Sequence, residues 1–98
     1  TPAGNSMVLS EEDQAITLTD QNSNQIIMDP DGIQILSAKD ITIEAPGKID
    51  ISATQDLTMQ GLNVTGTAQA QMKVEGSAGA ELSTSAIATI KGSLVQIN

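Results

Sequence analysis

Hydrophobic residues recur in a fixed pattern along most of this chain. From residue 33 onward, two apolar side chains stand one residue apart, and the pair returns every eight residues. A first array runs through Ile33/Ile35, Ile41/Ile43, Ile49/Ile51 and Leu57/Met59. After a step of seven, a second array runs through Val64/Gly66, Met72/Val74, Ala80/Leu82 and Ala88/Ile90, and Val95/Ile97 follow seven residues later. A constant spacing of this kind indicates a structural repeat.

The alternation of apolar and polar positions within each unit predicts a β-strand with one buried face. Ile, Val and Thr, which favour strands, dominate these segments. We interpret each unit as a strand of about five residues followed by a corner of about three, with aliphatic side chains inward and polar side chains outward. Ala45, Ala53 and Gly61 fall on the inward side at the corners, where little room is available. Leu36 lies in an outward position and fits this scheme poorly.

The junctions between units carry no regular hairpin signal. Asp31-Gly32 is the only Asp-Gly pair and there is no Asn-Gly pair, which argues against a meander of antiparallel hairpins. A chain that turns the same way at every corner stacks its strands into a parallel β-helix. We therefore expect an all-β fold with a repetitive β-helix over residues 31–98. An irregular strand-and-loop segment, irregular in cross-section or locally antiparallel, precedes it over residues 1–30, with strand-like pairs at Met7/Leu9, Ile16/Leu18 and Ile26/Met28.

The segment from Gly76 to Thr89 is rich in Ala, Ser, Gly and Thr. One interpretation is a flexible linker of low complexity. The other is a narrow stretch of core, because Leu82, Ile87 and Ile90 still punctuate the segment and the eight-residue phase survives.

Composition excludes several classes of function. The 98 residues include no Phe, Tyr or Trp, so one chain has no large ring with which to fill a round core. A net charge of −8 repels phosphate backbones, and nucleic-acid binding is not expected. The absence of Cys and His removes disulfides, thiolate ligands and the usual general base. No apolar run approaches the ~20 residues needed to span a bilayer, and residues 1–10 do not have the pattern of a signal peptide.

The carboxylates do not form a recognisable catalytic or metal-binding motif. Asp29-Pro30-Asp31-Gly32 resembles the start of a calcium loop but lacks the ligands at alternate positions that such a loop requires, so we predict a turn. Asp40, Asp50 and Asp56 lie on successive units and could form an outer ladder of the kind found in polysaccharide-cleaving enzymes. Without aromatic platforms, a solvated acidic face is the better interpretation. We predict no catalytic residue, no metal and no cofactor.

Two long stretches, ITLTDQNSNQIIMDPDGIQILSAKDITIEAPGKIDISA and AQMKVEGSAGAELSTSAIATIKGSLVQIN, resemble the C-terminal β-helix of VgrG-type spike proteins of contractile injection systems, which include type VI secretion and phage-tail-like particles. The ending KGSLVQIN is the most specific part. The resemblance implies an intertwined, triple-stranded homotrimer that pierces membranes as a structural spike. It further implies assembly in the bacterial cytoplasm, expulsion toward a target cell, and only transient contact with the target envelope. The trimer core would contain Ile33, Ile35, Ile41, Ile43, Ile49, Ile51, Leu57, Met59, Met72, Val74, Leu82 and Ile90.

The C-terminal end is the expected partner-binding site. Some spikes of this kind end in a metal-bound apex with His-x-His motifs, whereas this chain has no His and should end bluntly. The resemblance implies a platform that carries a separate tip protein of the PAAR-repeat class, or an effector, formed by Ser93, Leu94, Val95, Gln96, Ile97 and Asn98. Two alternatives stay open: the stalk of a trimeric adhesin or tail fibre, and, from another class, a β-helical carbohydrate-active enzyme.

Overall fold

The computed structural model describes residues 1–98 and is all-β, as expected from the sequence. It has four strands and no helix: β1 (Ser6–Ser10), β2 (Ala15–Thr19), β3 (Gln25–Asp29) and β4 (Gly32–Leu36). The chain divides into two units, Thr1–Ala53 and Thr54–Asn98, and all four strands belong to the first.

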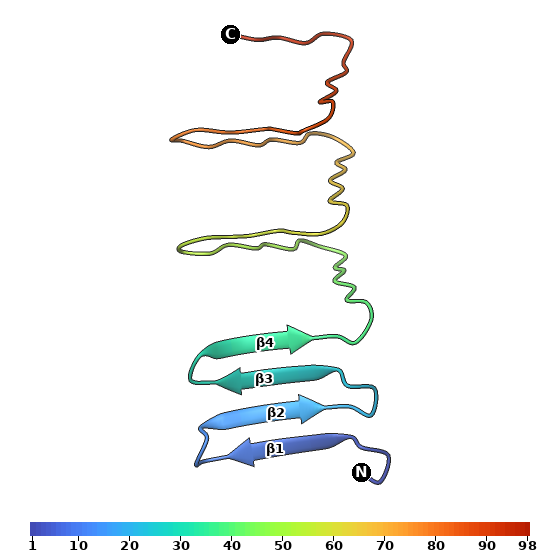
Figure 1. Ribbon diagram of the computed structural model, residues 1–98, viewed down its shortest axis with the longest axis vertical. Coiled ribbons are helices and arrows are strands. Elements are labelled where there is room, and N and C mark those ends of the chain that lie inside the picture. The colour runs from blue at the N-terminus through green and yellow to red at the C-terminus, as the bar shows by residue number, and fades with distance from the viewer. The chain divides into compact units, whose positions relative to one another are not determined.

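The four strands form one antiparallel sheet in the order β1-β2-β3-β4, so each strand pairs with its neighbour in sequence (Figure 1). The register places Met7 opposite Leu18, Leu18 opposite Ile26, and Ile26 opposite Ile35. The prediction that the chain avoids a meander of hairpins is therefore wrong for this part of the chain. Of the two possibilities left open for residues 1–30, the antiparallel one is found, and it continues to Leu36.

The first two hairpins form without glycine, because polar side chains and unusual backbone angles make their loops. In the β1–β2 loop, the hydroxyl of Ser10 accepts a hydrogen bond from the backbone N–H of Asp13 (3.1 Å), and Gln14 adopts a φ of 52°. In the β2–β3 loop, Ser23 adopts a φ of 71° and its N–H donates to the carbonyl of Asp20 (3.3 Å). Loops of four and five residues are common in hairpins, but they carry a weaker sequence signal than an Asn-Gly pair.

The third hairpin is the turn predicted at Asp29–Gly32. Asp29 Oδ1 accepts a hydrogen bond from the backbone N–H of Asp31 (2.9 Å), which closes a tight turn after β3. Gly32 has a φ of 128°, a conformation that residues with a side chain rarely adopt. The Asp-Gly signal therefore marks a hairpin, and the prediction of a turn is confirmed.

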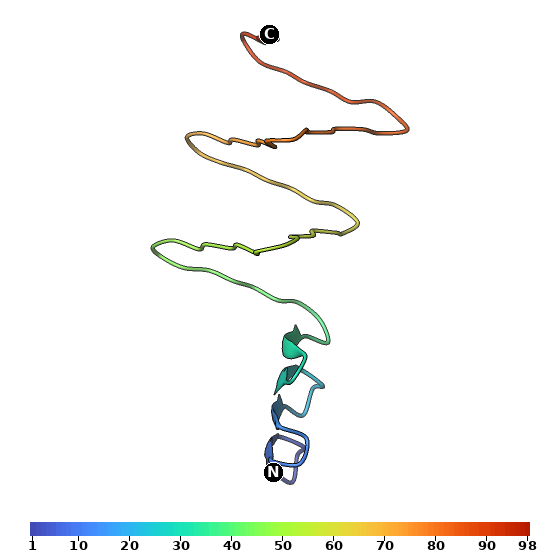
Figure 2. The ribbon, with the colours of Figure 1, turned by 90° about the vertical axis from the view of Figure 1, so that its left-hand side faces the viewer.

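Beyond β4 the chain forms no further strand but bends at regular intervals. Straight segments separate these bends, and Figures 1 and 2 draw them without arrows. The bends lie at residues 38–39, 46–47, 54–55, 62, 69–70, 77–78, 85–86 and 93–94. Their spacing is eight residues apart from one step of seven after residue 62. The eight-residue unit and its corners therefore exist in the structure as the apolar pairs predicted, and they continue through the segment from Gly76 to Thr89.

A small residue precedes every bend. The eight positions are occupied by Ser37, Ala45, Ala53, Gly61, Ala68, Gly76, Thr84 and Gly92. The sequence pattern had identified only Ala45, Ala53 and Gly61 as corner residues. At Gly76 the approach is closest, because an added Cβ would overlap the carbonyl oxygen of Gly79. Small side chains thus leave room for the backbone to turn at each corner.

Residues 37–98 make no backbone–backbone hydrogen bond within the chain. The strands of the expected parallel β-helix are therefore not paired by one chain alone. Backbone N–H and C=O groups need partners wherever water is excluded. In residues 37–98, side chains of the same chain bond four of these groups, near the first and the seventh bend. The partners of the other groups are water or another molecule.

Candidate functional site

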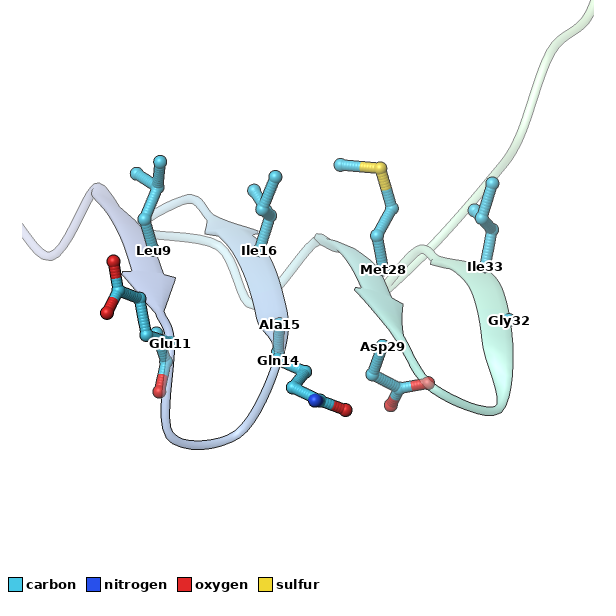
Figure 3. Close-up of a pocket in the computed structure, with 10 residues that line it drawn as sticks. Leu9, Glu11, Gln14, Ala15, Ile16, Met28, Asp29, Gly32 and Ile33 are labelled. Carbon is cyan, nitrogen blue, oxygen red and sulfur yellow. The ribbon is translucent and has the colours of Figure 1, made fainter.

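One face of the β1–β4 sheet is entirely apolar. The antiparallel register aligns two rows of four side chains that run across all four strands. We call this surface the apolar face, and it consists of Met7, Leu18, Ile26 and Ile35 in one row and Leu9, Ile16, Met28 and Ile33 in the other. Figure 3 shows that the side chains of the second row all project to the same side of the sheet.

The edge strands of the apolar face are largely open to solvent within a single chain, and the two central strands are partly covered. Met7 and Leu9 on β1 are 68% and 70% exposed, and Ile33 and Ile35 on β4 are 70% and 63% exposed. A shallow hollow of about 630 Å³ lies along the row from Leu9 to Ile33, and another of about 740 Å³ lies along the row that contains Leu18 and Ile26. Exposed apolar surface of this extent indicates a binding surface.

Charged side chains stay off the apolar face. Glu11 and Asp29 lie at the strand ends and extend away from the row of aliphatic side chains (Figure 3). The other carboxylates of residues 1–36 are in loops, at Glu12, Asp13, Asp20 and Asp31. A partner can therefore cover the apolar face without burying a charge.

All the residues expected in the trimer core are also exposed in the single chain. Ile41 and Ile51 are 55% and 68% exposed, and Met72 is 57% exposed. No hydrophobic side chain anywhere in the chain is buried. One chain therefore has no core, and the structure leaves the proposed core positions free for contacts with other chains.

The bends fix the position of each apolar pair. In every unit from Ile41/Ile43 to Ala88/Ile90, the first member of the pair stands two residues after the bend. Polar residues alternate with the pair: Lys73 and Glu75 flank Val74, and their side chains form an ion pair with an Nζ–Oε2 distance of 3.2 Å. An i, i+2 pair can form only if both side chains lie on one side of an extended segment. Lys73 and Glu75 therefore occupy the side opposite to Met72 and Val74.

Polar contacts hold the β2–β3 loop in place. The side-chain amide of Asn24 donates to Asp20 Oδ2 (2.9 Å), and the backbone N–H groups of Asn24 and Asn22 donate to Asp20 Oδ1 (both 2.9 Å). These hydrogen bonds, led by the one from the Asn24 side chain, favour the charged carboxylate and lower the pKa of Asp20 below its usual value of 3.8.

The same loop contacts the segments before and after the sheet. Asn5 Oδ1 accepts a hydrogen bond from the backbone N–H of Gln21 (2.8 Å). Asn24 Oδ1 accepts one from the backbone N–H of Ala38 (2.8 Å), at the first bend of the repeat. The Asp20–Asn24 loop therefore anchors the point at which the chain leaves the sheet. The amino-acid pattern predicts only an irregular strand-and-loop segment here and does not indicate this role.

The predicted tip residues lie at and after the last bend, and all six are exposed. Leu94 is 80% exposed, Val95 50% and Ile97 87%. The apolar pairs predict a second step of seven residues, from Ala88 to Val95, but the last two bends are eight residues apart. Instead, Val95 follows its bend by one residue rather than by two.

The predicted acidic ladder of Asp40, Asp50 and Asp56 is exposed. No cluster of three or more acidic side chains is close enough to hold a metal ion. No helix in the structure is long and apolar enough to cross a membrane.

Comparison with models of known protein families and with curated proteins found no match.

Proposed function

We propose that this chain is a non-enzymatic spike segment of a contractile injection machine, built from three intertwined copies. In residues 37–98 the three chains share every layer of a parallel β-helix, with the aliphatic pairs on a common axis. The assembled rod pierces a target envelope and carries a PAAR-type tip protein or an effector at its C-terminal end. Assembly takes place in the bacterial cytoplasm, before the particle is expelled.

The observation that carries this proposal is the repeat in residues 37–98. Bends recur every eight residues with one step of seven, a pair of positions at i and i+2 follows each bend at a constant distance in all but the last unit, and no backbone group bonds to another backbone group of the chain. A chain that folded alone would bury its apolar pairs in its own core and pair its own strands. Here both the side chains and the backbone groups are available to other copies, which is what an intertwined helix needs.

Energetics favour association. Full burial of an Ile, Leu, Val or Met side chain gains about 1.5–3 kcal/mol relative to leaving it exposed. Each chain contributes a dozen such core positions, all of them exposed in the isolated chain. Pairing between chains also removes the open strand edges that a single chain would leave. Folding and association then become one event, and the stability depends on protein concentration.

The proposed mechanism is mechanical. A contracting sheath supplies the force, and the rod supplies stiffness along its axis because each layer bonds to the layers above and below. The acidic exterior, with a net charge of −8 per chain, keeps the β-rich surface wetted and discourages edge-to-edge aggregation. The resemblance to VgrG-type spikes provides the functional context, and the structure contributes the repeat on which the proposal depends.

Sedimentation analysis tests the assembly. Three chains of 10.1 kDa should sediment as one elongated particle of about 30 kDa. Unfolding should be slow and show hysteresis, because separation of the chains must break pairing between distant segments. A monodisperse monomer under native conditions would contradict the proposal.

A further inference from the structure

The apolar face of β1–β4 differs from the repeat in one respect: its strands are already paired within one chain. It therefore cannot be intertwined in the same way, and it needs a covering surface rather than a strand partner. We propose that three copies of the chain pack their apolar faces against one another, and that this contact sets the register in which the three repeats wind. The inference rests on the proposed trimer.

The chemistry of the face fits a second and third copy of itself. Its eight members are all Met, Leu or Ile, and every carboxylate of this region lies in a loop or at a strand end. Copies that each carry a charge of −8 would repel if their acidic loops met. Contact through the uncharged faces places the loops at the corners, where the charges stay solvated.

The spacing of apolar side chains on the face also matches their spacing in the repeat. Each strand presents two apolar side chains one residue apart, as every unit of the repeat except Val64/Gly66 does. Inside the first unit, the pair Ile33/Ile35 on β4 is followed after eight residues by Ile41/Ile43. A layer made of three such strands has the same two aliphatics per side in both segments, so one apolar axis can run through both.

The repeat alone does not determine how the three chains align with one another. If one chain slides along its own path by eight residues, the apolar pairs stay in phase over residues 37–60 and again over 63–92. The seven-residue step after residue 62 is the one irregularity of the bends that opposes such a slip. The strands of the sheet begin at Ser6, Ala15, Gln25 and Gly32, and three different loops connect them. An eight-residue shift would align the apolar positions of β1 with Ala15 and Thr17, and those of β3 with Gln34 and Leu36, which lie on the opposite face of the sheet. Only one alignment of three sheets therefore buries all three faces.

Nuclear magnetic resonance of the full-length chain, labelled with ¹⁵N at glycine only, tests the register. The chain has eight glycines, so an in-register symmetric trimer should give eight amide resonances. Leu18→Asp places three carboxylates on the packed faces. We expect that it gives more than eight resonances, or lowers the trimer fraction by at least about tenfold. The matched variant Thr17→Asp alters the opposite side of the same strand and should keep eight resonances. A Leu18→Asp trimer with eight resonances would overturn the inference.

Thiol accessibility provides a measurement that does not depend on disrupting the fold. Met7 and Val8 are adjacent on β1, lie on opposite faces, and are 68% and 51% exposed in the single chain. The native chain has no cysteine, so Met7→Cys and Val8→Cys variants each carry one thiol. A water-soluble maleimide should label the thiol at position 7 at least about tenfold more slowly than the thiol at position 8 in the trimer. Equal rates in a stable trimer mean that the face is open to another ligand, and the inference fails. A wild-type monomer would instead refute the proposed trimer itself.

Discussion

Replacement of Ile51 by Asp tests the assignment of the axis most directly. Ile51 is 68% exposed in the single chain and belongs to the expected core. If the trimer buries Ile51 completely, burial gains about two-thirds of the 1.5–3 kcal/mol that full burial of an aliphatic side chain provides, or about 1–2 kcal/mol per chain. The substitution removes this gain. Three chains therefore lose about 3–6 kcal/mol from this contact alone.

The introduced charges add a larger cost. Three carboxylates would meet on an apolar axis, and burial of an unpaired ion costs several kcal/mol for each. A folded domain is stable by about 5–15 kcal/mol in total, so the combined loss exceeds what most assemblies can tolerate. We expect Ile51→Asp to abolish the trimer at micromolar concentration.

Asp50 provides the matched control, because it is the preceding residue and lies on the opposite side of the segment. It is exposed, and substitution of an exposed residue usually changes stability by no more than about 0.5 kcal/mol. Asp50→Ala should therefore leave the trimer intact. Sedimentation velocity at several concentrations distinguishes the two variants. If Ile51→Asp and Asp50→Ala sediment alike, the side assigned to the axis is wrong.

Three further predictions concern the tip, the β2–β3 loop and the corners. Deletion of residues 93–98 should abolish capture of the cognate PAAR-type protein in a pull-down while the trimer persists. Replacement of Leu94 and Val95 by Lys should weaken capture. Undiminished capture by the truncated rod would mean that the partner binds elsewhere on the rod. Hydrogen bonds lower the pKa of Asp20 in the folded chain, so the stability that its carboxylate contributes is complete above pH 3.8 and is lost as the pH falls through the lowered pKa. Acid should therefore lower the melting temperature of the wild type more than that of Asp20→Asn. Equal acid sensitivity of the two proteins would mean that the loop does not stabilise the fold. Gly76→Ala should lower the melting temperature more than Gly47→Ala, because an added Cβ would overlap the Gly79 carbonyl oxygen at the first site and meets nothing within 4 Å at the second.

The sequence predicted the repeat well because the repeat is a local property. Two inward side chains and one small corner residue in each unit reflect the pleat of an extended segment and the space at a bend, and both appear directly in the amino-acid order. Ala45, Ala53 and Gly61 could be assigned to corners for this reason. Ser37 and Thr84 occupy equivalent corners, but their hydroxyl groups made them resemble outward polar positions.

The antiparallel sheet could be predicted only in part. Its third turn carries the Asp-Gly signal, whereas the first two depend on Gln14 and Ser23, which adopt positive φ angles that their residue types rarely take. Hydrogen bonds from backbone N–H groups to the Ser10 hydroxyl and the Asp20 carboxylate compensate for this within the loops. The apolar face was missed because its two rows depend on the register of three hairpins. The pairs themselves, such as Met7/Leu9, were visible, but their alignment was not.

The last unit of the repeat departs from the others in a way that bears on the tip. In the seven preceding units the pair of positions at i and i+2 begins two residues after the bend, but Val95 follows its bend by one. Alternation along the extended segment then puts Gln96 and Asn98 in the positions that the aliphatic pair takes elsewhere, and Val95 and Ile97 in the positions that polar residues take. If the proposed rod kept its winding to the end, its final layer would therefore direct amide groups toward the axis and aliphatic groups outward. Such a layer is unsuited to extend the rod, and it presents the apolar rim that a capping partner would need to cover.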